Sequence, residues 1–340
     1  MNKKPSVAAL AALAALAVVA AVIGTLGFAS VPAVADSPRT ASAHLAPHLA
    51  PHLAPHIAAH FDLAAGQTPE NGVLEPDGSL DVTFSVARQV ARVGVDGRTR
   101  ILATMPLPAD GGVDTPVLHF APTMGIVRAD DGTLYFLYDT GTADLTGVWR
   151  LRPHGTPERI AALPADGLPN GMALDRRTGR LYIADSVLGT VWTVPVGGGT
   201  PTVWTRAPEL AYSAIAGANG VKIHDNALWV SNTDAGTILR IPFLPGDRPG
   251  RLQVRATGLT TVDDFTFTGV GDEMLVALNH TDTVVRVRED GSRATVLTGA
   301  DGLQNPTAIE VRGDTVYVLN AAYVTGEDPN VLVAGLRELR

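Results

Sequence analysis

The sequence contains no cysteine among its 340 residues. No disulfide can therefore hold the fold together, and lipid attachment to an N-terminal cysteine is excluded. The hydrophobic core must stabilise the protein alone. Hydrophobic residues make up 46% of the chain, which is enough to build a large core.

Basic clusters and aromatic residues are scarce as well. No long Lys/Arg run follows Lys3 and Lys4, and the formal net charge is −8. A nucleic-acid-binding surface needs a basic patch or stripe, so this charge distribution argues against nucleic acid as a partner. With only 6 Tyr, 4 Trp and 8 Phe, the chain also has little material for a large aromatic binding face.

The N-terminus has the pattern of an export signal. Lys3 and Lys4 precede an apolar stretch over residues 7–28, and "VPAVADS" offers an A-x-A cleavage site after Ala35. We therefore expect residues 1–35 to be a signal peptide and the mature protein to be extracellular. The alternative is an uncleaved anchor, because the apolar stretch is just long enough to span a bilayer. Only in that case would residues 7–28 attach the protein to a membrane.

The stretch "HLAPHLAPHLAPHIAAH", from His44 to His60, carries five of the nine histidines at intervals of four residues. Its prolines, Pro47, Pro51 and Pro55, are incompatible with a regular helix, since each lacks an amide hydrogen and pushes the preceding residue toward extended geometry. Imidazoles in such a tract can bind Zn²⁺ or Cu²⁺ weakly. The nearly perfect HLAP repeat instead favours a polyproline-like His/Pro-rich linker over residues 36–57.

Six similar units follow this linker. Each has a short apolar strand, a D-G or G-D turn, a second strand such as LYIADS or LWVSNTD, and an alternating third strand such as TVWTVPV. Short runs of β-branched and aromatic residues broken by Gly and Asp are typical of strands and turns. The units start near Glu70, Thr123, Asn170, Asn219, Asp263 and Asn305, at separations of 53, 47, 49, 44 and 42 residues. That period is close to the length of a four-stranded propeller blade.

We therefore predict an all-β fold, a six-bladed β-propeller of four-stranded blades, over residues 58–340. The last unit lacks an obvious fourth strand, whereas "AAHFDLAAG" (Ala58–Gly66) is an unpaired strand candidate ahead of the first unit. Pairing of this N-terminal strand with the last blade would close the ring and remove two open sheet edges. We expect the closed ring to be a monomer.

Four units place an oxygen-bearing side chain immediately before the inner strand, namely Glu70, Asn170, Asn219 and Asp263. The inner strands of a propeller line its central channel, so ring closure would bring these side chains together at one mouth. Two carboxylates and two amide oxygens suit a hard cation, Ca²⁺ before Mg²⁺. Each residue alone would more often be a turn former. Turn chemistry, however, requires neither Glu in the first unit nor Asp in the fifth, so the sequence predicts one Ca²⁺ in the channel.

The motifs "TPENGVLEPDG", "LPNGMALD", "ANGVKI" and "VDDFTF" resemble those of the senescence-marker-protein/gluconolactonase-like superfamily of six-bladed propellers. The resemblance covers nearly everything from about Phe61 to the end. Relatives in that superfamily include regucalcin-like gluconolactonases, paraoxonases and diisopropyl fluorophosphatase. In the last two, a Glu, two Asn and an Asp hold a catalytic calcium, which implies that role for the four side chains at the blade starts. The resemblance also implies a second-rank ligand at Asp264, where paraoxonases have an additional amide.

The second unit departs from the paraoxonase pattern. Met124 stands at the place where paraoxonases carry a histidine at the mouth. His280, in "ALNHTDT" after the second strand of the fifth unit, is the remaining candidate for a catalytic histidine, with a structural role as the alternative. His119 and His224 are less well placed for such a role.

The ligand pattern and the resemblance predict a calcium-dependent hydrolase that acts on a small-molecule lactone or related ester. The ion would polarise the carbonyl or phosphoryl oxygen, and Asp263 would act as general base or nucleophile.

The alternative is a non-catalytic secreted propeller that binds a protein or sugar with a structural calcium. A pocket with convergent polar groups would favour the enzyme, and an exposed apolar or aromatic patch the binding module. A strictosidine-synthase-like condensation would need an acidic residue in an apolar pocket, and the sequence singles out none.

Overall fold

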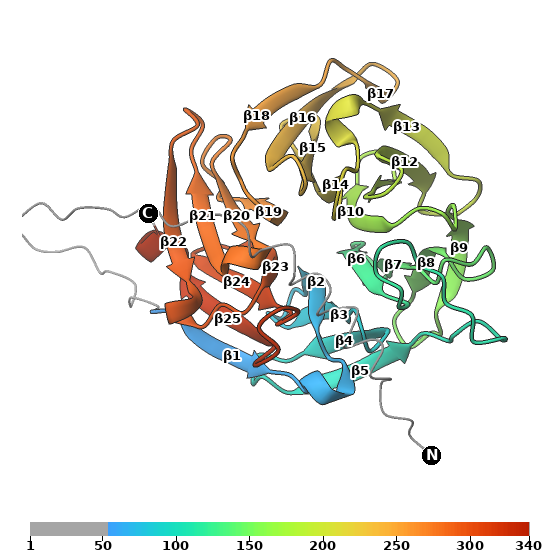
Figure 1. Ribbon diagram of the computed structural model, residues 1–340, viewed down its shortest axis with the longest axis horizontal. Helices are drawn as coiled ribbons and strands as arrows, with labels where there is room; N and C mark the ends of the chain where they lie inside the picture. Colours follow the sequence, from blue (N-terminus) through green and yellow to red (C-terminus); the bar gives the residue numbers. More distant parts are fainter. Residues whose placement is uncertain (1–53, 340) are drawn as a thin grey trace, which may run out of the picture.

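The computed structural model describes residues 54–339, which form six antiparallel sheets around a central axis (Figure 1). The predicted all-β, six-bladed propeller is confirmed. The export signal predicted over residues 1–35 lies outside the described residues, as do His44, His48 and His52 of the histidine tract. Within residues 54–339, no helix is both long and apolar enough to cross a membrane.

The first strand of each blade lies next to the channel, and the later strands follow outward (Figure 1). Blade one contains β2 (Pro69–Leu74), β3 (Leu80–Phe84), β4 (Gln89–Val93) and β5 (Thr99–Thr104). Blade two contains β6 (Thr123–Arg128), β7 (Leu134–Tyr138), β8 (Gly147–Leu151) and β9 (Glu158–Ala162). Blade three contains β10 (Pro169–Asp175), β11 (Arg180–Asp185), β12 (Thr190–Pro195) and β13 (Thr202–Arg206).

The other three blades repeat this order with small variations. Blade four contains β14 (Ala218–His224), β15 (Ala227–Asn232), β16 (Thr237–Leu244), β17 (Arg248–Pro249) and β18 (Gln253–Ala256). Blade five contains β19 (Val262–Phe267), β20 (Met274–Leu278), β21 (Thr283–Val287) and β22 (Arg293–Thr298). Blade six contains β23 (Pro306–Arg312), β24 (Thr315–Asn320) and β25 (Asn330–Gly335). Short 3₁₀ helices are η2 (Leu63–Ala65), η3 (Pro208–Leu210), η4 (Asn279–Thr281), η5 (Gly299–Asp301) and η6 (Leu336–Leu339).

The N-terminal strand closes the ring as predicted. Strand β1 (His56–His60) pairs antiparallel with β25, so blade six obtains its outer strand from the other end of the chain. The strand begins two residues before the expected boundary at residue 58, because Ile57 packs into the core between blades five and six. It also ends earlier than the strand expected over Ala58–Gly66, since Leu63–Ala65 form η2. His60 Nδ1 lies 2.8 Å from Asp328 Oδ1. His56 and His60 thus belong to the propeller and not to the linker.

The core of the described chain is divided into six hydrophobic clusters, and each of them fills the space between two neighbouring blades. The cluster at the seam joins β1 and blade six to blade one. There the rings of Phe61 and Phe84 meet edge to face, with centroids 4.8 Å apart. Because each sheet is buried on both faces, the ring is stable only when all six interfaces are filled. Closure by β1 is therefore part of the core.

Replacing Ala59 by Asp tests the closure. Ala59 is 4% exposed and belongs to the seam cluster, so an unpaired carboxylate there should reduce the free energy of unfolding by about 3 kcal/mol or more. Ala58→Asp is the matched control on the exposed face of the same strand and should change it by less than about 0.5 kcal/mol. Chemical denaturation measures both, and equal effects would contradict a closed seam.

Candidate metal centre at the channel mouth

The start of every inner strand carries an irregularity in its pairing with the second strand of the blade. In blade three the register shifts between Pro169 and Met172, and in blade four between Ala218 and Val221. Such a β-bulge, an extra residue in one strand of a pair, changes the direction in which the side chains point. Asn170 and Asn219 lie in the bulges of blades three and four, so their side chains at the mouth come from bulged backbone.

Glycines allow neighbouring inner strands to approach closely just below the mouth. A Cβ at Gly171 would lie 2.2 Å from the carbonyl oxygen of Asn219, and a Cβ at Gly220 would lie 2.4 Å from Asp264 Oδ1. No side chain fits at either position. The two Asn-Gly pairs are therefore not simple turn formers, since their glycines are required by the packing of one blade against the next.

A cavity of about 100 Å³ lies at this mouth. It is lined by five of the six side chains singled out in the sequence, namely Glu70, Asn170, Asn219, Asp263 and His280. They come from blades one, three, four and five, which lie far apart in the chain. The ring therefore brings these five residues together.

Both amide side chains present an oxygen that is available to a ligand. Asn170 Nδ2 donates to Ser186 Oγ at 3.2 Å, and Asn219 Nδ2 donates to Thr233 Oγ1 and to Asp263 Oδ1, both at 3.0 Å. These bonds occupy the NH₂ groups, and within residues 54–339 the Oδ1 atoms have no donor. The amides are thus oriented as oxygen ligands.

The two carboxylates at the mouth lie in the same cavity, Glu70 buried and Asp263 half-buried. Burial raises the pKa of Glu70 to about 7, the hydrogen bond from Tyr323 opposes this shift, and the charge of Asp264 adds to it. The Tyr323 hydroxyl donates to Glu70 Oε2 at 2.5 Å. Burial and the charges of Glu70 and Asp264 raise the pKa of Asp263 well above its ordinary value, although hydrogen bonds from Asn219 and Asn279 lower it. Desolvation disfavours the ionised forms, and a bound cation would reverse that effect.

Asp264 does not join this group, although it directly follows Asp263. Its Oδ2 lies 2.9 Å from Lys222 Nζ and accepts from Asn71 Nδ2 at 3.2 Å. Its Oδ1 accepts from the amide of Phe265 at 2.8 Å. The structure therefore places the second-rank ligand candidate outside the cavity lining, in an ion pair with another inner strand.

The remaining cavity wall is largely apolar. Met124 lines it at the place where paraoxonases carry a histidine, and the Ser85 hydroxyl contacts its sulfur at 3.9 Å. Val117 contributes to the wall with a φ of 65°, a conformation that β-branched residues rarely adopt. His119 is exposed and is not part of the lining. Burial lowers the pKa of His280, with an opposing effect of Asp282, so its imidazole is neutral near pH 7.

Several residues of the site were missed in the sequence although a periodic signal was present. In an antiparallel blade the first strand starts and the second strand ends at the same mouth. Four of the second strands are followed directly by polar residues that reach this site, namely Ser85, Ser186, Thr233 and Asn279. Tyr323 also lines the cavity, from the long loop between β24 and β25. Blade two has a loop of similar length at the same place, but its sequence differs, and the other blades have short turns there. No periodic signal therefore marks Tyr323.

The donors at the mouth fit a hard cation. Two carboxylates and two amide oxygens from different blades form an oxygen-only set, and the room left in the cavity can hold water molecules as further ligands. The set contains neither thiolate nor imidazole among its four primary candidates, so it suits calcium better than zinc or copper.

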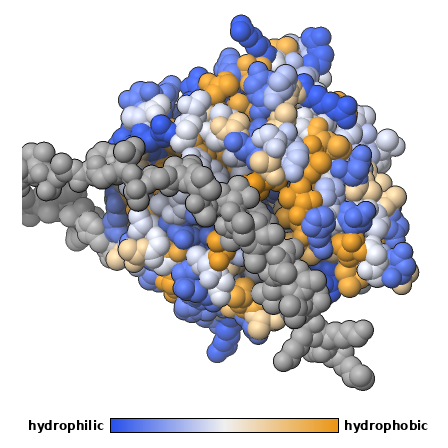
Figure 2. Space-filling view, viewed as in Figure 1, coloured by the Kyte–Doolittle hydropathy of each residue, from blue (hydrophilic) through white to orange (hydrophobic). Residues whose placement is uncertain are grey.

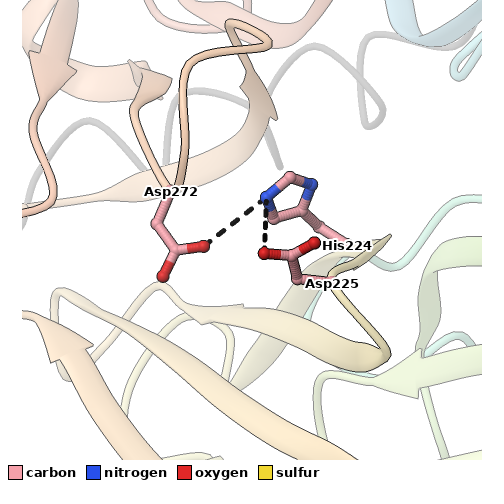
Figure 3. A group of neighbouring side chains, drawn as sticks. All are labelled: His224, Asp225 and Asp272. Carbon is pink, nitrogen blue, oxygen red and sulfur yellow. Dashed lines mark ion pairs between the residues drawn. The ribbon is translucent and has the colours of Figure 1, made fainter.

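A second group of possible ligands lies at the other end of the inner strands. His224, Asp225 and Asp272 point toward one another from the end of β14 and from the turn between β19 and β20, with ligand atoms within 4.8 Å (Figure 3). Asp272 Oδ2 is already 3.0 Å from a nitrogen of Arg255, and His224 Nε2 is 3.0 Å from the Gly271 carbonyl oxygen. The charge of Asp272 is thus compensated without an ion, and an imidazole is a poor ligand for calcium.

Comparisons with known proteins identify the fold. No family model matches the chain, and no curated protein matches it by sequence. Among solved structures, the calcium-binding protein regucalcin from Agrobacterium tumefaciens is 16% identical, with a TM-score of 0.60 over 82% of this chain and 94% of regucalcin. A proposed gluconolactonase is also 16% identical, with a TM-score of 0.60 over 83% of this chain and 92% of that one.

A catalytically inactive variant of virginiamycin B lyase from Staphylococcus aureus, solved with quinupristin, is similar as well. It is 13% identical, with a TM-score of 0.57 over 82% of this chain and 98% of the lyase. These neighbours are six-bladed β-propellers, and the fold implied by the sequence resemblance is therefore confirmed. At such low identity the likeness extends to the fold alone, and the chain is a six-bladed β-propeller of the kind found in regucalcin and virginiamycin B lyase.

Proposed function

We propose that this protein is a calcium-dependent hydrolase that opens a lactone or cleaves a related ester at the channel mouth. The main observation behind this proposal is the arrangement of oxygen ligands in the cavity. Asn170 and Asn219 are held with their oxygens unpaired, beside the buried carboxylate of Glu70 and the half-buried carboxylate of Asp263. Buried carboxylates with raised pKa values, grouped in a pocket, are typical of a functional site. Regucalcin, which shares the fold, is described as a calcium-binding protein.

The four oxygen ligands would hold the ion, and the other residues would position substrate and water. When bound there, calcium would polarise the carbonyl oxygen and stabilise the negative charge that develops on it. Asp263 would take the proton of the attacking water, since Asn219 and Asn279 hold its carboxylate in place. The neutral imidazole of His280 lines the same cavity and could accept or return a proton during ring opening.

The apolar wall supports a neutral, partly apolar substrate. Leu118, Phe120, Ile215 and Val324 line the cavity beside the polar group. Such a surface favours the hydrocarbon part of an ester and offers little to a charged substrate. The convergence of a few polar groups on an otherwise apolar pocket is the feature expected of an enzyme of this fold.

The non-catalytic alternative receives less support from the surface. Figure 2 shows hydrophobic residues in short patches among hydrophilic ones on the visible part of one face. Of the large hydrophobic residues that are exposed among residues 54–339, Tyr212 alone is aromatic. A module that binds a protein or sugar would favour a broader apolar or aromatic patch. The hydrolase is therefore the better proposal.

We further propose that the hydrolase is extracellular. This rests on the basic start, the apolar stretch and the A-x-A site before Asp36. A fold without cysteine is compatible with export, because it needs no disulfide for stability. Its partner would be a small-molecule substrate, with the ring acting as a monomer.

Calcium titration by calorimetry tests the site. The metal-free protein should bind one ion per chain, and a variant carrying Glu70→Gln and Asp263→Asn should lose affinity by at least about 100-fold, because both charged ligands are gone. A control carrying Glu209→Gln and Asp290→Asn, two exposed carboxylates outside the cavity, should bind as the wild type does. A variant with His44, His48 and His52 replaced by Ala should also bind normally. Binding that is lost only in this last variant would contradict the proposal.

The raised pKa of Glu70 predicts how the stability of the metal-free protein depends on pH. The pKa of Glu70 is about 7 in the folded chain and near 4.5 when unfolded, so the folded state holds the proton more tightly. The contribution of Glu70 to the free energy of unfolding is fully present below the unfolded value and falls by up to about 3 kcal/mol as the pH rises from about 4.5 through 7. Glu70→Gln should flatten this part of the stability curve, and saturating calcium should oppose the loss. Burial also raises the pKa of Asp139, to about 6, and its contribution should remain in the variant.

Tyr323→Phe tests whether the Tyr323 hydroxyl positions the proposed metal ligand Glu70. Loss of the hydroxyl removes the hydrogen bond to Glu70, which should weaken calcium binding by roughly 10-fold. Tyr182→Phe is the matched control, because the buried Tyr182 hydroxyl has no hydrogen-bond partner within the described part of the chain. Calorimetry on the two variants should separate them clearly, and equal affinities would show that Tyr323 does not position Glu70.

A further inference from the structure

A second charged group lies among the inner strands, separate from the cavity lining. Lys222 extends from β14, and its Nζ is 2.9 Å from Asp264 Oδ2 on β19 and 3.6 Å from Glu310 Oε1 on β23. Asn71 on β2 donates to the same Asp264 oxygen at 3.2 Å. These four residues come from β14, β19, β23 and β2, the inner strands of four successive blades around the channel (Figure 1).

The group is largely shielded from water. The side chains of Asp264, Lys222 and Glu310 are 4%, 21% and 23% exposed. Two carboxylates in such a place require a positive charge, because an uncompensated buried charge is strongly unfavourable. Among the basic side chains of the described chain, Lys222 is the one that contacts them. The ammonium therefore has the place that a small cation would otherwise take among these oxygens.

We propose that Lys222 is a tethered cation that fills a second potential metal site in the channel and so limits the protein to one exchangeable ion. The carboxylate oxygens of Asp264 and Glu310 then form a latent site for a divalent cation, which binds only when the ammonium is removed. Asn71 holds Asp264 through its amide nitrogen, and its own oxygen accepts from the Gly72 amide. The same pairing explains why Asp264 is unavailable to the mouth, despite its place beside Asp263. The inference extends the proposed calcium site but is tested independently of it.

The test removes the ammonium and keeps the hydrocarbon stem. Lys222→Met is titrated with calcium by calorimetry, beside wild type, Lys222→Arg and a triple variant that carries Lys222→Met, Asp264→Asn and Glu310→Gln. Lys222→Met should bind one more calcium ion per chain than wild type, whereas the Arg and triple variants should show no gain. In chelator, Lys222→Met should melt roughly 5–10 °C below wild type, and added calcium should restore much of this loss.

A variant without the mouth ligands separates the two proposals. In a chain with Glu70→Gln and Asp263→Asn, wild-type Lys222 should allow no calcium binding, and Lys222→Met should create one site. This gain would support the tethered cation even if the mouth of the wild type binds no calcium. The inference is overturned if Lys222→Met folds and gains no ion. It is also overturned if that variant fails to fold at any calcium concentration, since calcium should replace the ammonium.

Discussion

Negative charge around the channel axis is the constraint on which the rest of the structure depends. Glu70 and Asp263 lie at the mouth, Asp264 and Glu310 lie within the group of inner strands below it, and Lys222 is the ammonium that contacts two of the four. If all were ionised, the channel would carry three uncompensated charges. The raised pKa values of Glu70 and Asp263 are the response of the metal-free protein. Occupation of the mouth by one divalent cation would compensate for most of this charge.

The propeller builds this concentration of charge from ordinary strand geometry. Inner strands converge on the axis, and their bulged starts turn the polar side chains into one cavity. Antiparallel pairing then brings the ends of the second strands to the same mouth, where they supply Ser186 and Thr233 as hydrogen-bond partners for the amide ligands. Six interblade cores, closed at the seam by β1, hold these elements in place. Burial of these charged groups costs folding free energy, which the packing of the surrounding ring must offset.

Most of the fold and part of the site could be predicted from the sequence. The blade period was visible because each blade repeats the same strand and turn chemistry, and Asn170 and Asn219 could be found because they occupy the same phase of that repeat. The ion pair of Asp264 could not be predicted, because its partner Lys222 belongs to another blade. Tyr323 lies in a loop whose sequence does not repeat between blades, and its contact with Glu70 joins blade six to blade one. Such contacts depend on the three-dimensional register of the ring.

The most direct test is a crystal of the mature protein, grown with calcium and measured for anomalous scattering. The account predicts a single strong peak at the channel mouth, with oxygens of Glu70, Asn170, Asn219 and Asp263 at the 2.3–2.6 Å that is typical of calcium. The Lys222 ammonium should remain between Asp264 and Glu310, with no peak beside it. An empty mouth, or a peak only at His224 and Asp272, would contradict the account.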